Sequence, residues 1–398
     1  MRRRRPATGT VVVLTLLLAG CQGAGEGSRT GDSGDNGSKG AEVSGPSTAG
    51  ARDTSTEGGP RTVTISGSGD VLPHAAVLDS ARATPGDGYD FAPSLAEIAP
   101  SVRAADIAVC HLETPISADG TGLTVPGPMV FSSPRELADD LAGAGFDGCD
   151  TASNHVWDRG LAGLEDTAAV LEDAGLAHAG PAPEQAERGE VAWYRHDGVD
   201  VAQLAYTYTL LNSGGPSTTV PDEAPWTDAS LWPVQGAAGI LQDARAARAE
   251  GADVVVVSMH WGDEYVTEPT GEQRDIARRL LTSGEVDLIL GTHAHVVQPC
   301  EQIDGRYVFY GLGNLLSNQS PSTSAGLRAE TQEGVLVDVE LVERDGRWST
   351  RAAGYRPTRV DLDGHVVRPT RPGSVSHERV FTTLTSLGEA SCPLTSPG

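Results

Sequence analysis

Short apolar runs recur along the chain, and several of them end in polar residues that are able to bind metals. Apolar and polar positions alternate over residues 61–68, which is typical of a strand that runs into a loop at Asp70. Apolar runs over residues 106–110 and 146–152 predict two further strands. The pattern therefore predicts strands that deliver polar side chains to their ends.

Helix and strand signals alternate in the middle of the chain. A helical pattern over residues 236–250 is followed by a β-branched run over 252–259, and a second helical pattern over 272–283 precedes an apolar run over 286–290. This alternation predicts βαβ units and a mostly parallel sheet. Residues 344–346, Arg-Asp-Gly, stand between two alternating runs and predict an antiparallel hairpin.

The first 20 residues have the three parts of a secretory signal peptide. Four arginines precede an apolar stretch over residues 11–18, and small residues stand directly before Cys21. The tetrapeptide that ends at Cys21 resembles a bacterial lipobox, which predicts that Cys21 is lipidated and becomes the mature N-terminus. The alternative is an ordinary signal with a coincidental cysteine. A lipid anchor would hold an exported domain on the outer face of the cell membrane.

Residues 21–61 are dominated by Gly, Ser, Thr, Asp and Glu and contain almost no apolar side chain. They cannot bury enough surface to offset the entropy of ordering, so we predict a disordered tether. The folded domain is expected over residues 62–370. The last stretch, residues 371–398, is predicted to be an unstructured C-terminal tail.

Composition and charge limit the possible partners. With 38% hydrophobic residues, the chain is neither collagen-like nor wholly disordered. Its 29 basic and 54 acidic residues give a formal net charge of −25, which argues against nucleic acid as a partner. An acidic surface also repels anionic substrates at long range. Binding a phosphate or polycarboxylate would therefore need a local positive centre such as a metal ion.

Export would place the four cysteines beyond Cys21 in a compartment that permits disulfides. Their connectivity cannot be deduced from the sequence. We favour a bridge between Cys300 and Cys392, because it would fasten the C-terminal tail. Cys110 and Cys149 fall in predicted core strands and are equally well explained as buried thiols.

The polar residues at the strand ends form the candidate site. They combine imidazole, carboxylate and amide groups: Asp70, Glu113, Asn154, His260, His293 and His295. Ligands bind at the carboxyl ends of strands in open α/β sheets, and these side chains suit Mn, Fe or Zn. Two histidines at spacing i, i+2 in a turn can face two ions. Two ions about 3.5–4 Å apart can clamp a phosphoryl group and activate a water.

Each of these residues alone has a plainer explanation. A single strand-end histidine is more often a hydrogen-bonded structural residue, and a lone Asp after Gly is more often a turn former. The conjunction favours a metal site, because four of the ten histidines occupy such positions, His155 among them. Four of the remaining histidines are interpreted as surface residues: His178, His196, His365 and His377.

Six short motifs follow one another along the chain. They are Gly69-Asp70-Val71, His111-Leu112-Glu113-Thr114-Pro115-Ile116, Ala152-Ser153-Asn154-His155-Val156-Trp157-Asp158-Arg159-Gly160, His260-Trp261-Gly262-Asp263-Glu264-Tyr265, Gly291-Thr292-His293-Ala294-His295-Val296-Val297-Gln298-Pro299 and Gly311-Leu312-Gly313-Asn314. In this order they resemble the motifs of the CapA family, the poly-γ-glutamate capsule biosynthesis proteins, which are related to calcineurin-like metallophosphoesterases. The resemblance covers about residues 63–316.

The resemblance implies an α/β fold, a four-layer αββα sandwich of two mixed sheets, with two divalent transition metal ions (Mn, Fe or Zn) at one edge. The implied ligands are Asp70 and His295 for one ion, Asn154, His260 and His293 for the other, and Glu113 in the bridging position. His155 would serve as a proton donor or transition-state stabiliser. Asp158, one helical turn later, could orient the ring of His155.

Two departures from the family's pattern bear on the site. The usual Asp-x-His start reads Asp70-Val71-Leu72, so the first ion lacks a ligand unless His74 or His111 reaches it. The usual Asn-Leu-Glu reads His111-Leu112-Glu113, and this histidine could add a ligand or alter a substrate contact. We expect substrate contacts from five residues of these motifs: His111, Trp261, Glu264, Tyr265 and Asn314.

The resemblance implies a membrane-anchored protein of capsule or poly-γ-glutamate biosynthesis. It would use its metal centre to hydrolyse or transfer a phosphoester or an amide of an anionic polymer, together with other capsule synthesis proteins. Small phosphoesters are an alternative substrate class. Two other hypotheses stay open: a non-catalytic accessory protein that binds and exports or attaches the polymer, and a structural domain stabilised by metal.

Overall fold

The computed structural model describes residues 59–82, 88–186 and 188–395, which belong to a compact unit spanning residues 57–398. The predicted signal peptide, Cys21 and the predicted tether up to residue 58 lie outside the described residues. Within the described ranges, every helix is too short or too polar to traverse a lipid bilayer.

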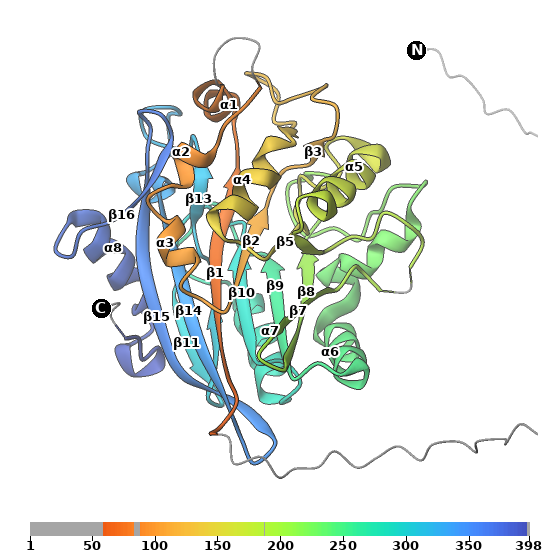
Figure 1. Ribbon diagram of the computed structural model, residues 1–398, viewed down its shortest axis with the longest axis vertical. Coiled ribbons are helices and arrows are strands. Elements are labelled where there is room, and N and C mark those ends of the chain that lie inside the picture. Colours follow the sequence, from red (N-terminus) through yellow and green to blue (C-terminus); the bar gives the residue numbers. More distant parts are fainter. Residues whose placement is uncertain (1–58, 83–87, 187, 396–398) are drawn as a thin grey trace, which may run out of the picture. The chain divides into compact units, whose positions relative to one another are not determined.

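The first sheet has eight strands and is built around β1. Its order is β16-β15-β14-β1-β2-β5-β6, and β13 also pairs with β1 (Figure 1). The strands are β1 (Thr62–Leu72), β2 (Ile107–Leu112), β5 (Gly148–Asp150), β6 (Ala177–Ala179), β13 (Asn314–Ser317), β14 (Glu333–Arg344), β15 (Arg347–Asp361) and β16 (Val366–Pro369). β1, β2, β5, β6 and β13 are parallel, whereas β14, β15 and β16 are added in antiparallel fashion. The sheet is therefore mixed, and the hairpin predicted at residues 344–346 is confirmed as the β14–β15 turn.

The second sheet has six strands in the order β11-β12-β10-β9-β8-β7. They are β7 (Ala192–His196), β8 (Val199–Thr207), β9 (Val254–His260), β10 (Leu288–Thr292), β11 (Cys300–Ile303) and β12 (Arg306–Phe309). Its four central strands are parallel, and β11 and β7 close the two sides in antiparallel fashion. The predicted helix–strand alternation is confirmed by α6 (Trp232–Glu250), β9, α7 (Gly271–Thr282) and β10.

Helices cover the outer faces of both sheets. The first sheet is covered by α1 (Ala75–Ala81), α2 (Ala92–Leu95), α3 (Ala99–Val102), α4 (Glu136–Ala144) and α5 (Gly160–Asp173). Leu137 and Val170 of these helices pack in one cluster with Cys110 of β2. On the other side, Leu280 of α7 packs with Val257 of β9. The layers run helix, sheet, sheet, helix, which confirms the expected αββα sandwich of two mixed sheets.

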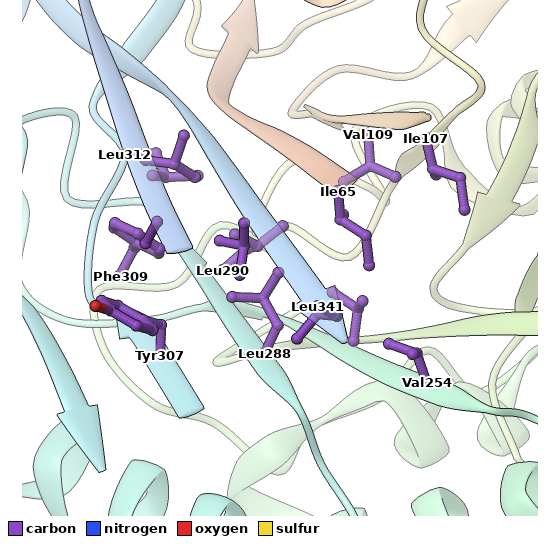
Figure 2. Packing of buried hydrophobic residues seen from close by; sticks show 14 of the residues in the cluster. Ile65, Ile107, Val109, Val254, Leu288, Leu290, Tyr307, Phe309, Leu312 and Leu341 are labelled. Carbon is purple, nitrogen blue, oxygen red and sulfur yellow. The ribbon is translucent and has the colours of Figure 1, made fainter. Parts of the chain in front are cut away.

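The central core lies between the two sheets. Figure 2 shows Ile65 and Val109 of the first sheet in the same cluster as Leu288 and Leu290 of the second. Ile289, between these two leucines, belongs instead to the core beneath α6 and α7. Because successive side chains of a strand point to opposite faces, β10 contributes to both cores and is buried along its whole length.

Residues 371–395 are folded, so the prediction of an unstructured tail is wrong over these residues. It contains α8 (Val375–Leu384), which lies beside β15 in Figure 1. The hydroxyl of Ser374 caps this helix by accepting a hydrogen bond from the backbone N–H of His377. Val380 and Leu384, four residues apart on one helix face, are buried in the central core. The elements not yet named are β3 (Ile116–Ser117), β4 (Ser133–Pro134) and the 3-10 turns η1 (Pro225–Ser230), η2 (Ala329–Gln332) and η3 (Glu389–Ser391).

The four cysteines of the described residues form two disulfides. Cys300, at the start of β11, is bonded to Cys392, with their Cα atoms 5.6 Å apart. Cys110 and Cys149 are also bonded, with a Cα separation of 4.4 Å. The interpretation of this second pair as buried thiols does not hold, because the parallel pairing of β2 and β5 sets the two residues directly opposite each other.

Two of the histidines interpreted as surface residues are buried. His365 accepts or donates hydrogen bonds at both ring nitrogens, to Ser80 Oγ at 2.7 Å and to Asn318 Oδ1 at 2.9 Å. The ring of His377 packs against Tyr355. A histidine whose ring nitrogens have hydrogen-bond partners can be buried at little cost in free energy. The two partners of His365 lie far from it in the chain and could not be predicted.

Asp70 lies inside β1 rather than in a loop that follows it. The strand continues to Leu72 because β13 pairs with it there, which places Asp70 opposite Asn314. Gly69 permits this approach: a Cβ atom at residue 69 would collide with the backbone carbonyl of Gly313. The same carbonyl accepts a hydrogen bond from the N–H of Asp70 at 2.9 Å.

We expect Gly69→Ala to lower the free energy of unfolding by about 1–3 kcal/mol or more, because the added methyl must push two backbone segments apart. Gly143→Ala is the matched control, since Gly143 lies in α4 with open space around it; that change should be neutral or stabilise by about 0.5–1 kcal/mol. Urea unfolding followed by circular dichroism measures both. Equal stability of the two variants would contradict the close approach.

Candidate metal centre

Six polar residues predicted at strand ends meet in one buried cluster. They come from both sheets: Asp70 on β1, Glu113 after β2, Asn154 after β5, His260 at the end of β9, and His293 and His295 after β10. All six are buried. The carboxyl ends of the parallel strands share one edge of each sheet, and the two edges lie against each other here.

The cluster contains three overlapping groups of possible metal ligands. Within each group, the ligand atoms lie within 4.8 Å of one another. The groups are Asp70 with His111 and His260, Glu113 with His260 and His293, and Asp70 with Glu113 and His295. Asp70, Glu113 and His260 each belong to two of the groups. The bridging role that the resemblance implies for Glu113 stays a prediction.

The turn after β10 aims two histidines at the cluster through an unusual backbone conformation. His293 has φ 88° and His295 has φ 54°, values that are uncommon for residues other than glycine. The N–H of His293 donates to Asp70 Oδ1 at 3.3 Å, and His295 Nδ1 lies 2.9 Å from Asp70 Oδ2. Backbone strain of this kind collects at functional sites, where neighbouring contacts hold it in place.

Several polar atoms of the cluster are buried without a hydrogen-bond partner among the described residues. Both carboxylate oxygens of Glu113 are in this state, as are His111 Nε2 and His293 Nδ1. His260 Nε2 and His295 Nε2 lie 3.6 and 3.7 Å from Glu113 Oε1, beyond hydrogen-bond distance. Buried polar groups nearly always have partners. Facing oxygen and nitrogen atoms that lack them fit a bound cation, and this mixture of donors suits Mn, Fe or Zn.

Burial and neighbouring charges decide how the cluster is protonated. Burial raises the pKa of Glu113 to about 7, although the charge of His295 partly opposes this. Burial alone would lower the pKa of His295, but the charges of Glu113 and Asp70 outweigh it and raise that pKa to about 10. Burial lowers the pKa of His293 to about 3 and that of His260 well below its usual value. His260 and His293 are therefore neutral, the form in which imidazole binds a metal.

Asn154 is held by a second asparagine that the sequence did not single out. Its Oδ1 lies 2.8 Å from His260 Nε2, and its Nδ2 donates to Asn212 Oδ1 at 3.0 Å. This contact fixes the amide so that its oxygen faces the cluster. Asn212 lies in the loop after β8, and its Nδ2 also donates to the carbonyl of Met129 at 3.4 Å. A polar loop after a strand was the available signal, since the other cluster residues follow the same rule.

His155 lies beside the cluster in a fixed orientation. Its Nδ1 is 2.8 Å from Asp158 Oδ2, which is the contact expected from the spacing of the two residues. The same carboxylate oxygen accepts a hydrogen bond from the N–H of Phe131 at 2.6 Å. The ring of Phe131 packs edge-on against His155, with centroids 4.6 Å apart. The orientation of His155 therefore depends on the loop that ends at Phe131 as well as on Asp158.

The five residues expected to contact substrate have different surroundings. Trp261 is buried in the core beneath α6 and α7, where its Nε1 donates to the carbonyl of Tyr310. Asn314 is buried too: its Oδ1 lies 3.1 Å from His295 Nδ1, and its Nδ2 donates to protein oxygens. Trp261 thus packs in the core and Asn314 holds His295. Substrate contact by either residue stays a prediction. His111 lies within the cluster itself.

The other two expected substrate contacts lie at the edge of the cluster. Tyr265 has φ 64° and its ring centroid is 5.9 Å from that of His295. Glu264, beside it, is exposed. Tyr208 joins them although the sequence did not single it out; its ring lies 4.4 Å from that of His293. Tyr208 directly follows β8, so the strand-end rule that identified the histidines would also have found it.

A two-sheet αββα sandwich that gathers buried imidazoles and carboxylates at one edge defines a candidate metal-binding protein of the α/β class. The matching family is described as "bacterial capsule synthesis protein PGA_cap", and its model matches residues 64–319. The chain belongs to this family, which confirms the resemblance noted from the six motifs.

Two curated relatives and one solved structure illustrate the similarity. The PGA biosynthesis protein CapA of Bacillus subtilis is 24% identical over 290 residues, which cover 72% of this chain and 70% of the relative. The capsule biosynthesis protein CapA of Bacillus anthracis is 28% identical over 211 residues, 53% of this chain and 48% of the relative. The chain thus spans about half the length of the latter. The calcineurin-like phosphoesterase YfkN of Bacillus subtilis has 14% identity and a TM-score of 0.43, covering 81% of this chain and 98% of that structure.

We expect Glu113→Gln to stabilise the metal-free protein while reducing the stabilisation that added metal provides. Neutralising a buried carboxylate that has no hydrogen-bond partner removes a desolvation cost on the order of several kcal/mol. It also removes a charged ligand. Thermal unfolding in a chelator and then in Mn²⁺ or Zn²⁺ measures both effects.

Glu333→Gln is the matched control for that change. Glu333 is also buried, but Arg379 Nη1 donates to its Oε1 at 2.6 Å. Removing one partner of such a pair destabilises the protein by about 3–5 kcal/mol, whether or not metal is present. If Glu113→Gln destabilised the metal-free protein in the same way as Glu333→Gln, Glu113 would have a partner in the protein and the metal interpretation would be wrong.

Proposed function

We propose that the chain is a metal-dependent hydrolase or transferase that cleaves or transfers phosphoester or amide bonds during synthesis of an extracellular anionic polymer such as poly-γ-glutamate. The observation that carries this proposal is the Glu113–histidine cluster of unpartnered buried atoms directly beside the oriented ring of His155. The names of the two CapA relatives support the polymer context.

The cluster offers the ligands for divalent ions. Asp70, Glu113 and His295 form one group of donors, and Glu113, His260 and His293 form another. Asn154 adds an amide oxygen close to His260. When bound, such ions supply Lewis acidity, which polarises a phosphoryl or carbonyl oxygen and lowers the pKa of water. On an acidic chain they would also provide the local positive charge that an anionic polymer needs.

His155 is placed to move a proton. The carboxylate of Asp158 accepts the hydrogen on Nδ1 of His155, which leaves Nε2 as the atom that takes up or gives away a proton. Nearby packing by Phe131 limits rotation of the ring. A positioned general acid of this kind contributes typically about 10²- to 10⁴-fold to the rate. His155 would thus protonate the leaving group of the substrate without being a metal ligand.

The aromatic residues at the edge of the cluster restrict access to it. Tyr208 covers the ring of His293, and Tyr265 lies over His295. Gln319 Nε2 donates to the hydroxyl of Tyr265 at 3.4 Å, which fixes that side chain. These rings reduce contact of the cluster with bulk water, and a lower local dielectric strengthens the interaction of a polarised substrate with charged groups.

We expect His155→Ala to reduce turnover by about two orders of magnitude or more while metal content and thermal stability stay unchanged. Suitable substrates are a chromogenic phosphodiester and a γ-glutamyl amide, and metal content is measured by elemental analysis. His196→Ala is the matched control. His196 also contacts a carboxylate, Asp106 at 3.2 Å, but it ends β7 away from the cluster.

Two results would contradict the catalytic proposal. Loss of metal or stability in His155→Ala in proportion to its loss of activity would make His155 a structural residue. A wild-type protein that holds its metal, binds poly-γ-glutamate and turns over neither substrate would instead be the non-catalytic accessory protein.

We also propose that the chain is exported and anchored to the membrane through Cys21. The two disulfides of the folded unit fit an oxidising compartment outside the cytoplasm. We expect Cys21→Ser to move the protein from the membrane fraction to the soluble fraction, and mass spectrometry of the wild type to find no peptide upstream of Gln22. A Cys21→Ser protein that remains with the membrane would contradict the anchor.

A further inference from the structure

The sequence leaves open which side chain supplies a further metal ligand beside Asp70. Position 72, two residues later, carries a leucine whose side chain is buried in the fold, so it offers no donor. Two histidines, His74 and His111, are the candidates for the additional nitrogen near Asp70. The structure distinguishes them by where their ring nitrogens point.

His111 faces Asp70 across the junction of two strands. It is paired with Asp70 in the parallel register of β1 and β2, and its ring stacks on that of His260 with centroids 4.7 Å apart. The ligand atoms of His111, Asp70 and His260 lie within 4.8 Å of one another. Nε2 of His111 is buried and has no hydrogen-bond partner among the described residues. Once its proton is released, a nitrogen in this position can donate its lone pair to a cation.

The other nitrogen of His111 is held by a carboxylate that no motif indicated. Nδ1 lies 2.6 Å from Asp150 Oδ1. Asp150 is buried at the end of β5, directly opposite His111 in the β2–β5 pairing. The Cys110–Cys149 disulfide joins the preceding residue of each strand, so the alignment of His111 with Asp150 is fixed covalently. Metal-binding histidines characteristically donate their second N–H to such a carboxylate, which sets the tautomer and makes the free nitrogen a better ligand.

His74 is engaged elsewhere. Its Nδ1 lies 2.9 Å from the carbonyl oxygen of Leu72, and the N–H of Asn318 points to the same nitrogen at 3.4 Å. The ring packs edge-on against Phe131. His74 belongs to none of the three groups of possible ligands found within the described residues. It therefore has a structural role beside the loop that ends at Phe131.

We propose that His111 is a metal ligand that completes the coordination of the ion bound by Asp70, and that Asp150 is the positioning residue that orients it. This inference rests on the proposed metal centre and adds to it a nitrogen ligand, His111, and its carboxylate partner, Asp150. A rival role, in which His111 only contacts substrate, would leave metal binding unaffected when the histidine is replaced.

The test measures metal binding rather than turnover. Metal-free wild-type protein and variants are titrated with Zn²⁺ by calorimetry, and with Co²⁺ while the visible absorption of the cobalt is recorded. We expect His111→Asn to weaken one ion at least about 10-fold and to alter the cobalt spectrum, because a nitrogen donor is lost. Asp150→Asn should weaken the same ion about 10- to 100-fold with His111 still present. His74→Asn, the matched control, should keep the affinities and the spectrum of the wild type.

Thermal unfolding of each metal-free variant shows which of them are folded before titration. Wild-type affinities in both His111→Asn and Asp150→Asn would overturn the assignment of His111 while leaving the metal centre and the proposed function intact. A loss of one ion in His74→Asn with none in His111→Asn would transfer the role to His74. A wild-type protein that binds neither Zn²⁺ nor Co²⁺ would refute the metal centre itself, and the ligand role of His111 with it.

Discussion

A carboxylate buried without a hydrogen-bond partner needs positive charge close by. The candidate site depends on how the fold supplies that charge to Glu113. Two buried carboxylates away from the site are paired with arginines: Asp287 contacts Arg248, and Glu333 contacts Arg379. Asp70 and Glu113 have only histidines as charged neighbours in their ion pairs. Arginine provides a permanent positive charge, whereas imidazole can release its proton and coordinate a cation in its place. The choice of histidine therefore allows the positive charge near Glu113 to come either from a proton on His295, whose pKa is raised to about 10, or from a bound cation.

The rigidity of the surroundings explains how such a cluster can persist. Gly69 lets two backbone segments approach closely below Asp70, and the turn that carries His293 and His295 is held in a strained conformation by contacts to Asp70. The Cys110–Cys149 bridge adds a covalent restraint one residue before the cluster. Ligands on strands and on constrained turns keep their geometry better than ligands on free loops, so little of the binding energy is spent on ordering them.

Much of this arrangement could be predicted, because strand ends are visible in a sequence as the points where apolar runs stop. That rule indicated all six cluster residues, although Asp70 lies inside β1 and not at its end. The alternation of helix and strand over residues 236–290 predicted the parallel strands β9 and β10 of the second sheet. The roles of the supporting residues are harder to predict. Asp150 ends β5 and Asn212 lies in the loop after β8, so both obey the strand-end rule, but a lone Asp or Asn there is too common to stand out. Both act through pairings with residues far away in the chain. The helix at Val375–Leu384 could not be predicted because it is short and is buried only through contacts with strands whose place beside it the sequence does not reveal.

The order of the strands has a consequence for when the molecule can fold. β1 is the first strand of the folded unit, yet it pairs with β14, which comes much later in the sequence. Thr62, for example, pairs with Val342. Until β14 has been synthesised, the central strand of the first sheet exposes a row of unpaired backbone groups. Contacts between segments so far apart in the chain make folding slow. The Cys300–Cys392 bridge likewise joins two residues that are 92 positions apart. The first sheet and this bridge can therefore be completed only after nearly the whole of residues 62–392 has been synthesised.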